Sequence, residues 1–413
     1  MLNSCRVLDL TNERGMLCGQ ILGDLGAGVI AIERPGGSAV RQFGPFYENQ
    51  SDPNRSIYFW AYNRNKRAVT LNLETAEGRE LLLRLAARAD FLIESDNPGA
   101  MAALRLGPND LAAVNPALVY VSITPFGQDG PKAHYADSDL IIMAAGGPLI
   151  LYGDEDRPPI RMSVPQAYLH ACADAAGAAL IGYYERLRSG QGQSIDIAAA
   201  QSVGLAMQSV MLAAPLNAAD TRRMAGGAKM GRLRIPLVWQ AKDGQVSFVF
   251  LFGSALGPFT VRFMDYLYEI GGCDKATHDK DWIAFGDQLL SGKEPMEEYE
   301  RIKGVIAGYI AGKTKAEIFE LARAKGFLMA PVATVADVLA NPQFQARNYW
   351  QILDHPELGR EVKYPGPFAK FSQTPITYRR RPPLIGEHNR EIYQDELGLT
   401  AAQLADYGRR GII

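Results

Sequence analysis

Short apolar runs alternate with longer segments of helical spacing over the first part of the chain. Five runs have the length and composition of buried strands: residues 6–10, 29–33, 68–73, 90–94 and 118–123. Between them, residues 17–25 and 75–88 place apolar side chains three and four positions apart, and Thr75 is a good N-cap for the second helix. Strands that alternate with helices predict an α/β protein built on a parallel sheet.

The pattern changes after about residue 220. Before that point, residues 169–188 predict a helix rich in small residues, which leads through a glycine turn into a strand at 194–197. A basic, glycine-containing loop at 222–234 follows, and then Asp243-Gly244 lies between apolar runs at 236–240 and 246–251, which predicts a hairpin. Helices are expected near 297–311 and 315–325. These elements predict a second, smaller α+β unit.

Charge and cysteine content exclude several classes of function. The 413 residues carry 43 basic and 45 acidic side chains, so the net charge of −2 predicts neither nucleic acid nor membrane as a partner. There is no signal peptide and no spanning segment, and a cytoplasmic location is therefore expected. The four cysteines and five histidines are scattered, which predicts neither disulfides nor a metal site.

Two groups of residues could serve a nucleotide. The glycines of residues 23–28 follow a helix and precede a strand, which is the wrong order for a dinucleotide loop and disfavours an NAD-dependent enzyme. Arg34 follows a strand, at the sheet edge where ligands of α/β proteins bind, and Asn65, Lys66 and Arg67 lie just before the strand predicted at 68–73. From the residues alone, these cations are either phosphate ligands or a solvated charge run.

A series of short motifs, in order along nearly the whole chain, resembles the class III CoA-transferase family, the group of formyl-CoA and carnitine CoA-transferases. The motifs are residues 6–11 (RVLDLT), 25–35 (LGAGVIAIERP), 65–67 (NKR), 94–99 (ESDNPG), 126–131 (FGQDGP), 189–196 (SGQGQSID) and 386–389 (GEHN).

The resemblance implies an architecture and a substrate. A split large domain with a Rossmann-like core, residues 1–220 and 331–413, would enclose a small α+β domain at 221–330, and two subunits would interlock as linked rings. CoA thioesters would be substrates, with no metal. The residues that would bind the CoA moiety by resemblance are Arg34, Asn65, Lys66, Ser95, Asp96, Asn97 and Arg105, the last near Ala103, where the family usually has an arginine.

The family nucleophile is missing from its usual position. Members of the family use an Asp shortly before the long helix, and counting back from Gly190 places Tyr168 there. A phenol with a pKa of about 10 forms no anhydride. Asp174 and Asp139 are the fallback acids, although Asp174 would lie on another face of the helix. Ser138 stands where the racemase branch of the family has its His.

The missing Asp predicts a supporting subunit that has no catalytic residue of its own. It would pair with a homologous Asp-bearing subunit, as in heteromeric members of the family that move CoA from succinyl-CoA to aromatic dicarboxylic acids in anaerobic degradation. Two alternatives stay open. One is a homodimeric CoA-transferase or CoA-ester isomerase that uses another acid, and the other is a non-catalytic acyl-CoA-binding or scaffold protein.

Overall fold

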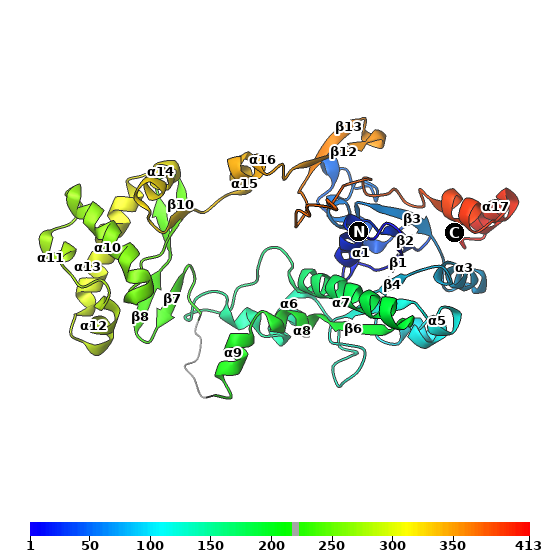
Figure 1. Cartoon of the computed structure of the whole chain (residues 1–413), viewed down its shortest axis with the longest axis horizontal. Coiled ribbons are helices and arrows are strands. Elements are labelled where there is room, and N and C mark those ends of the chain that lie inside the picture. Colours follow the sequence, from blue (N-terminus) through cyan, green and yellow to red (C-terminus); the bar gives the residue numbers. More distant parts are fainter. Residues whose placement is uncertain (217–222) are drawn as a thin grey trace. The chain divides into compact units, whose positions relative to one another are not determined.

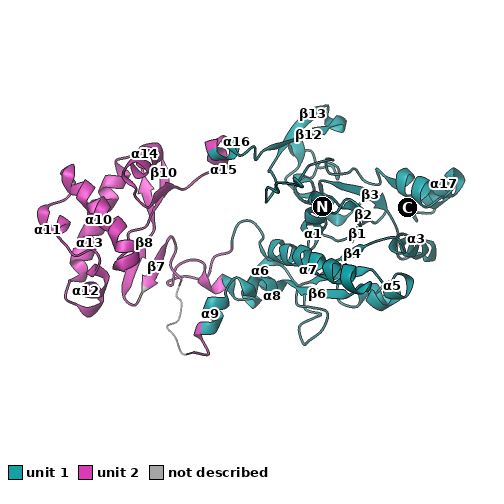
Figure 2. Ribbon diagram, viewed as in Figure 1, with its two compact units in different colours: residues 1–148, 162–212, 343–413 teal, residues 149–161, 213–342 magenta. Residues whose placement is uncertain are grey.

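The computed structural model describes residues 1–216 and 223–413, which form two compact units (Figure 2). The large unit contains residues 1–148, 162–212 and 343–413, and the small unit contains residues 149–161 and 213–342. The expected boundary at 220/221 lies outside the described residues. Residues 149–161 belong to the small unit because Arg223 donates to the carbonyls of Asp154 at 2.7 Å and Arg157 at 2.6 Å.

The small unit also extends beyond residue 330, to Pro342. Helix α15 (Val335–Ala340) is part of it, because Asp337 forms an ion pair of 2.7 Å with Lys315 at the start of α14 (Lys315–Lys325). Both ends of the chain lie in the large unit (Figure 1).

The large unit is built on a six-stranded parallel sheet in the order β3-β2-β1-β4-β5-β6. The strands are β1 (Arg6–Leu10), β2 (Gly28–Glu33), β3 (Lys66–Thr70), β4 (Phe91–Glu94), β5 (Val119–Thr124) and β6 (Ser194–Ala198). This confirms the predicted α/β class and the Rossmann-like strand order. The strand order reverses between β1 and β4, and such a switch point opens a crevice at the carboxyl ends of the strands.

Helices cover both faces of this sheet. On one face, apolar residues of α3 and α5 pack on the strands together with the C-terminal segment, and on the other α1 and α7 pack against each other and the sheet. Thr75 caps α3 as predicted, because its hydroxyl accepts from the Gly78 N–H at 3.0 Å. The α-helices of this unit are α1 (Met16–Asp24), α2 (Ile57–Asn63), α3 (Ala76–Ala86), α4 (Ala100–Ala103), α5 (Pro108–Val114), α6 (Asp139–Ala145), α7 (Ala167–Ser189), α8 (Ala199–Leu205), α9 (Gln208–Ala213), α16 (Pro342–Ala346) and α17 (Ala401–Arg409).

The C-terminal GEHN motif covers the exposed edge of β3. The His388 N–H donates to the Ala68 carbonyl at 2.9 Å, and His388 Nδ1 accepts from the Ala68 N–H at 3.2 Å. Asn389 Oδ1 accepts from the Thr70 N–H at 2.9 Å. The motif therefore satisfies backbone groups that an open edge strand would present to other chains. A hairpin of β12 (Gln351–His355) and β13 (Arg360–Tyr364) precedes it within the proline-rich tail.

The small unit combines a three-stranded antiparallel sheet with helices. The predicted hairpin is confirmed as β9 (Val238–Ala241) and β10 (Gly244–Phe248), with β11 (Met329–Pro331) on the other side of β10. Phe248, Phe250, Trp282 and Tyr299 form the centre of its core. The remaining elements are β7 (Gly227–Met230), β8 (Leu233–Pro236), α10 (Gly253–Glu269), α11 (Lys275–His278), α12 (Phe285–Ser291) and α13 (Met296–Ala311). In the described part of the chain, no helix is long and apolar enough to cross a membrane.

Candidate functional site

A cavity of about 500 Å³ lies at the carboxyl ends of β1, β2 and β4, beside the switch point of the sheet. Arg34, which follows β2, and Asp96, which follows β4, both line it, and Arg34 is exposed. Burial raises the pKa of Asp96, while the guanidinium groups of Arg14 and Arg34 act in the opposite direction. Other lining residues are Leu10, Thr11, Asn12, Ile32, Glu33, Pro35, Ser38, Leu71, Asn72, Leu73, Glu74, Leu104 and Gly411.

The loops after β1 and β4 are joined across the switch point. The Asn12 N–H donates to Ser95 Oγ at 2.9 Å, and the Ser95 hydroxyl donates to Asn12 Oδ1, also at 2.9 Å. Ser95 is buried, so its hydroxyl holds the two loops together, and of the predicted residues Ser95–Asn97 it is Asp96 that lines the cavity.

Tyr168 lies in a polar network centred on Arg14. Its hydroxyl, at the start of α7, donates to Asp137 Oδ2, and Arg14 donates to Asp137 Oδ1 at 2.7 Å. Arg14 also donates to Asn97 Oδ1 at 2.9 Å. The Arg14 and Asp137 side chains are 15% and 13% exposed. Burial, and then the hydrogen bond to Asp137, raise the pKa of Tyr168, which keeps the phenol neutral.

Neither of the two fallback acids is bonded to Arg14 or Tyr168 in this network. Asp139 Oδ1 accepts the N–H groups of Gln166 at 2.6 Å and Ala167 at 2.8 Å, so this carboxylate satisfies backbone donors at the start of α7. Asp174 is exposed on another face of α7. Sequence reasoning missed Arg14 and Asp137, which meet through loops 123 residues apart and carry no local signal.

Lys66 and Asn65 are buried among protein partners. Lys66 Nζ lies 2.7 Å from Asp9 Oδ2, and it donates to the Met16 carbonyl and to Asn63 Oδ1 at 2.8 and 2.9 Å, so all three of its donors are used. Asn65 donates to Asp24 Oδ1 and accepts the backbone N–H groups of Arg379 and Arg380. The polar groups of these two side chains are committed to tertiary structure, whereas that of Arg34 is exposed at the cavity.

Arg105 lines a second cavity of about 430 Å³ together with Arg79. Leu104 belongs to the walls of both this cavity and the one at the switch point. The two cavities therefore adjoin at Leu104. Arg79 donates to the carbonyls of Leu73 and Glu74, while Arg105 is exposed.

Glu94, the last residue of β4, is a buried acid beside a third cavity of about 380 Å³. Its carboxylate accepts from the Ser122 hydroxyl and from the Asp96 N–H. Burial raises the pKa of Glu94 to about 7, against the opposing effect of these hydrogen bonds. Within the described residues, no group of three or more His, Cys, Asp and Glu side chains is placed to hold a metal ion.

The strand order and the crevice at its switch point are those of a doubly wound α/β protein, and comparison with known proteins specifies the family. Residues 2–389 match the model of CoA-transferase family III, and the chain belongs to this family. It is 32% identical to the subunit BbsE of succinyl-CoA:(R)-benzylsuccinate CoA-transferase from Thauera aromatica, over 99% of this chain and 97% of that protein. It is 30% identical to succinyl-CoA–D-citramalate CoA-transferase from Chloroflexus aurantiacus, over 98% and 96%.

Solved structures agree with this assignment. A CAIB/BAIF family protein from Brucella suis superposes with a TM-score of 0.79 at 26% identity, covering 95% of this chain and 98% of that one. The chain is therefore a CoA-transferase homologue, and the predicted family and enzyme class are confirmed.

Proposed function

We propose that this chain is the supporting subunit of a heteromeric CoA-transferase that moves CoA from succinyl-CoA to an organic acid, with a homologous Asp-bearing subunit as its partner. The observation that carries the proposal is the neutral Tyr168 phenol at the start of α7, bonded to a carboxylate that Arg14 also holds. By resemblance to the family, Tyr168 stands where the nucleophile is expected, and its hydroxyl is used in a structural hydrogen bond to Asp137. The similarity to BbsE, named as a subunit of a succinyl-CoA-dependent enzyme, supports this proposal.

The chemistry would take place on the partner subunit. There, an Asp carboxylate attacks the thioester carbonyl of the donor and expels CoA thiolate, which leaves a mixed anhydride. The thiolate then attacks the Asp carbonyl of the anhydride, releases the donor acid and forms an enzyme thioester. The acceptor carboxylate attacks the carbonyl of this enzyme thioester and expels CoA thiolate, which leaves a second mixed anhydride. The thiolate then attacks the acceptor's carbonyl in that anhydride, which forms the new acyl-CoA and frees the Asp carboxylate. This chain supplies no covalent step.

CoA would bind in the crevice at the switch point. Arg34 offers an exposed guanidinium there, and the exposed Arg105 of the adjoining cavity offers a second, which suits the several phosphate groups of CoA. A cytoplasmic location is a further part of this proposal, because acyl-CoA substrates are expected there.

An exposed apolar stripe on α7 supports an obligate assembly. Ile181, Tyr184 and Leu187 recur every three residues on one side of the helix, and they are 71%, 72% and 68% exposed. Large apolar side chains gathered on one surface mark an interface with another chain. We assign this stripe to the partner subunit in the interlocked pair that the family resemblance implies.

The test is CoA transfer from succinyl-CoA to benzylsuccinate and to a panel of other dicarboxylic acids. The chain is assayed alone and then mixed with the Asp-bearing homologue encoded beside it. We expect turnover in the mixture alone, with Tyr168→Phe nearly as active as the unchanged chain, and with the partner's Asp→Asn variant inactive. Turnover by the chain alone would overturn the supporting role.

A second candidate rests on Asp137, whose carboxylate lies next to the position of the family nucleophile. If the chain alone catalyses CoA transfer, Asp137 is the acid that this geometry favours as the nucleophile. Asp137→Asn would then abolish the reaction, and hydroxylamine would attack the Asp137–CoA thioester, release CoA and leave a hydroxamate on Asp137. Because both of its oxygens are already bonded to Arg14 and Tyr168, we favour the supporting role.

A further inference from the structure

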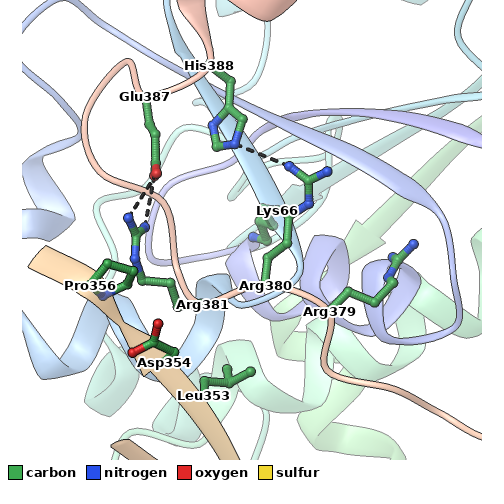
Figure 3. Close-up of a pocket in the computed structure, with 9 residues that line it drawn as sticks. All are labelled: Lys66, Leu353, Asp354, Pro356, Arg379, Arg380, Arg381, Glu387 and His388. Carbon is green, nitrogen blue, oxygen red and sulfur yellow. Dashed lines mark hydrogen bonds and ion pairs between the residues drawn. The ribbon is translucent and has the colours of Figure 1, made fainter. Parts of the chain in front are cut away.

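The chain has a cavity of about 360 Å³ at the other end of β3, away from the crevice described above. Lys66, the first residue of β3, lines this cavity, whereas Leu71, just after the last, lines the crevice. Five strand residues separate the two sites by roughly 15 Å. Three consecutive arginines, Arg379–Arg381, form the wall together with Leu353, Asp354, Pro356, Glu387 and His388 (Figure 3).

Two of the three guanidinium groups are already neutralised or committed. Arg379 donates to the carbonyls of Gly23, Gly26 and Ala27, which follow from the end of α1, at 2.8 to 3.0 Å. Arg381 makes two bonds of 2.9 Å to Glu387 and a further ion pair of 2.7 Å to Glu357. The backbone of Arg379 and Arg380 is fixed in turn by Asn65 Oδ1.

Arg380 differs from both neighbours. Among the described residues, no carboxylate lies within ion-pair distance of its exposed guanidinium, and its Nη1 lies 3.3 Å from His388 Nε2. Figure 3 shows Arg380 and His388 directed toward each other.

The Nε2 atom of the His388 ring carries a hydrogen, so it cannot accept a hydrogen bond from Arg380. Nδ1 accepts the Ala68 N–H, so it carries a lone pair, and a neutral imidazole then carries its hydrogen on Nε2. An Arg guanidinium offers donors and no acceptor. Two N–H donors therefore face each other across 3.3 Å beside an open cavity, where neither accepts from the other and one oxygen in the cavity can accept from both.

We propose that Arg380 and His388 form a binding site for a small oxyanion, a phosphate or a carboxylate, one oxygen of which accepts from both N–H donors on the cavity side. One guanidinium charge, one neutral imidazole N–H and an open cavity fit a singly held oxyanion better than a cation. The site is separate from the CoA crevice and does not depend on the transferase assignment. Asp354, which lines the same cavity, would oppose anion binding by like-charge repulsion.

The test measures binding of inorganic phosphate and of succinate to the full chain by calorimetry at constant ionic strength, with chloride as the reference salt. We expect a dissociation constant in the millimolar range for at least one of the two, which identifies the preferred oxyanion. Arg380→Gln should weaken it about tenfold or more, because a charge-assisted contact is lost. Asp354→Asn should strengthen it a few-fold.

Two controls locate the binding. Arg347→Gln removes an exposed arginine of the same unit and should leave the dissociation constant unchanged. Arg34→Gln tests whether the signal comes from the CoA crevice and should also leave it unchanged. We leave His388 unaltered, because its replacement would uncover β3. Absence of binding, or equal binding by Arg380→Gln and the unchanged chain, would overturn the proposal and assign a water molecule to the gap.

Discussion

Lys66 Nζ lies 2.7 Å from Asp9 Oδ2, and both side chains are about 1% exposed. This pair joins the start of β3 to β1 beneath α1, across the intervening strand β2. Gly19 of α1 passes so close that a Cβ there would lie 2.0 Å from the Asp9 carboxylate. The ion pair is therefore held out of bulk solvent, with Asp9 Oδ1 bonded to Thr11 and Lys66 Nζ bonded to Met16 and Asn63.

Lys66→Met should destabilise the large unit strongly, because it leaves the Asp9 carboxylate buried without its counter-charge. The expected loss is about 3–5 kcal/mol in the free energy of unfolding, measured by denaturant titration. The double variant Lys66→Met/Asp9→Leu should regain much of this loss. Lys370→Met, at an exposed site, should change the free energy by less than about 0.5 kcal/mol. An equally small effect of Lys66→Met would contradict the buried pair.

Glu94 should make the protein less stable as the pH rises from about 4.5 to about 7. Its pKa is about 7 in the folded chain against an ordinary value of 4.5, so the unfolded chain loses this proton first. Below this window the carboxyl is neutral in both states. Above it, the cost stays constant at about 3 kcal/mol, an order-of-magnitude figure for this shift. Glu94→Gln should lack this fall in the free energy of unfolding.

The quantity to compare is the difference in the free energy of unfolding between the unchanged chain and Glu94→Gln at each pH. Other groups titrate in both proteins, and their effects cancel in this difference. Glu361→Gln, at an exposed position, should follow the profile of the unchanged chain. Parallel profiles for Glu94→Gln and the unchanged chain would show that Glu94 titrates normally.

Arg34→Gln should weaken CoA binding by about tenfold or more, because Arg34 offers the exposed charge at the crevice. Isothermal titration with CoA, alone and in the assembled pair, measures this. The loss should shrink as salt is added, which distinguishes a phosphate contact from a packing defect. Arg347→Gln serves as the control, and equal affinity of Arg34→Gln and the unchanged chain would remove Arg34 from the CoA site.

Ile181→Glu should prevent assembly without unfolding the chain. Ile181 is 71% exposed on the stripe of α7, so a carboxylate there costs little in the isolated chain but would be desolvated in an interface. Sedimentation of the mixture with the partner subunit should show separate chains. Asp174→Gln, also exposed on α7, tests whether a change elsewhere on the same helix is tolerated. Intact pairs with Ile181→Glu would place the interface elsewhere.

Local patterns predicted much of the large unit, because its strands are continuous apolar runs and its helices begin at recognisable caps. Residues 6–10 form a strand as predicted, whereas the strand expected at 68–73 occupies 66–70. The chain leaves the sheet there because the Asn72 N–H bonds to the Ile412 carbonyl, a contact that no local pattern announces.

The C-terminal region was harder to predict. It is rich in prolines, which disfavour regular structure, yet it contains the hairpin β12–β13 and helix α17. The helix had a readable signal, since Thr400 and Gln403 form a capping box. For Asn65 and Lys66, the local sequence instead suggested a role that the structure does not support. Their residue types suit phosphate, and their burial follows from partners such as Asp24 and Asp9, which are distant in sequence.

The GEHN motif, which covers the edge of β3, is synthesised long after the strand itself. Thr70 and its cap Asn389 are 319 residues apart, and at 5–20 residues per second the ribosome needs roughly 16–64 s to bridge them. Throughout that interval the nascent chain carries a bare strand edge of the kind that recruits other strands. The last part of the chain to be made is thus the part that ends this exposure, so premature termination would release a fragment prone to aggregation.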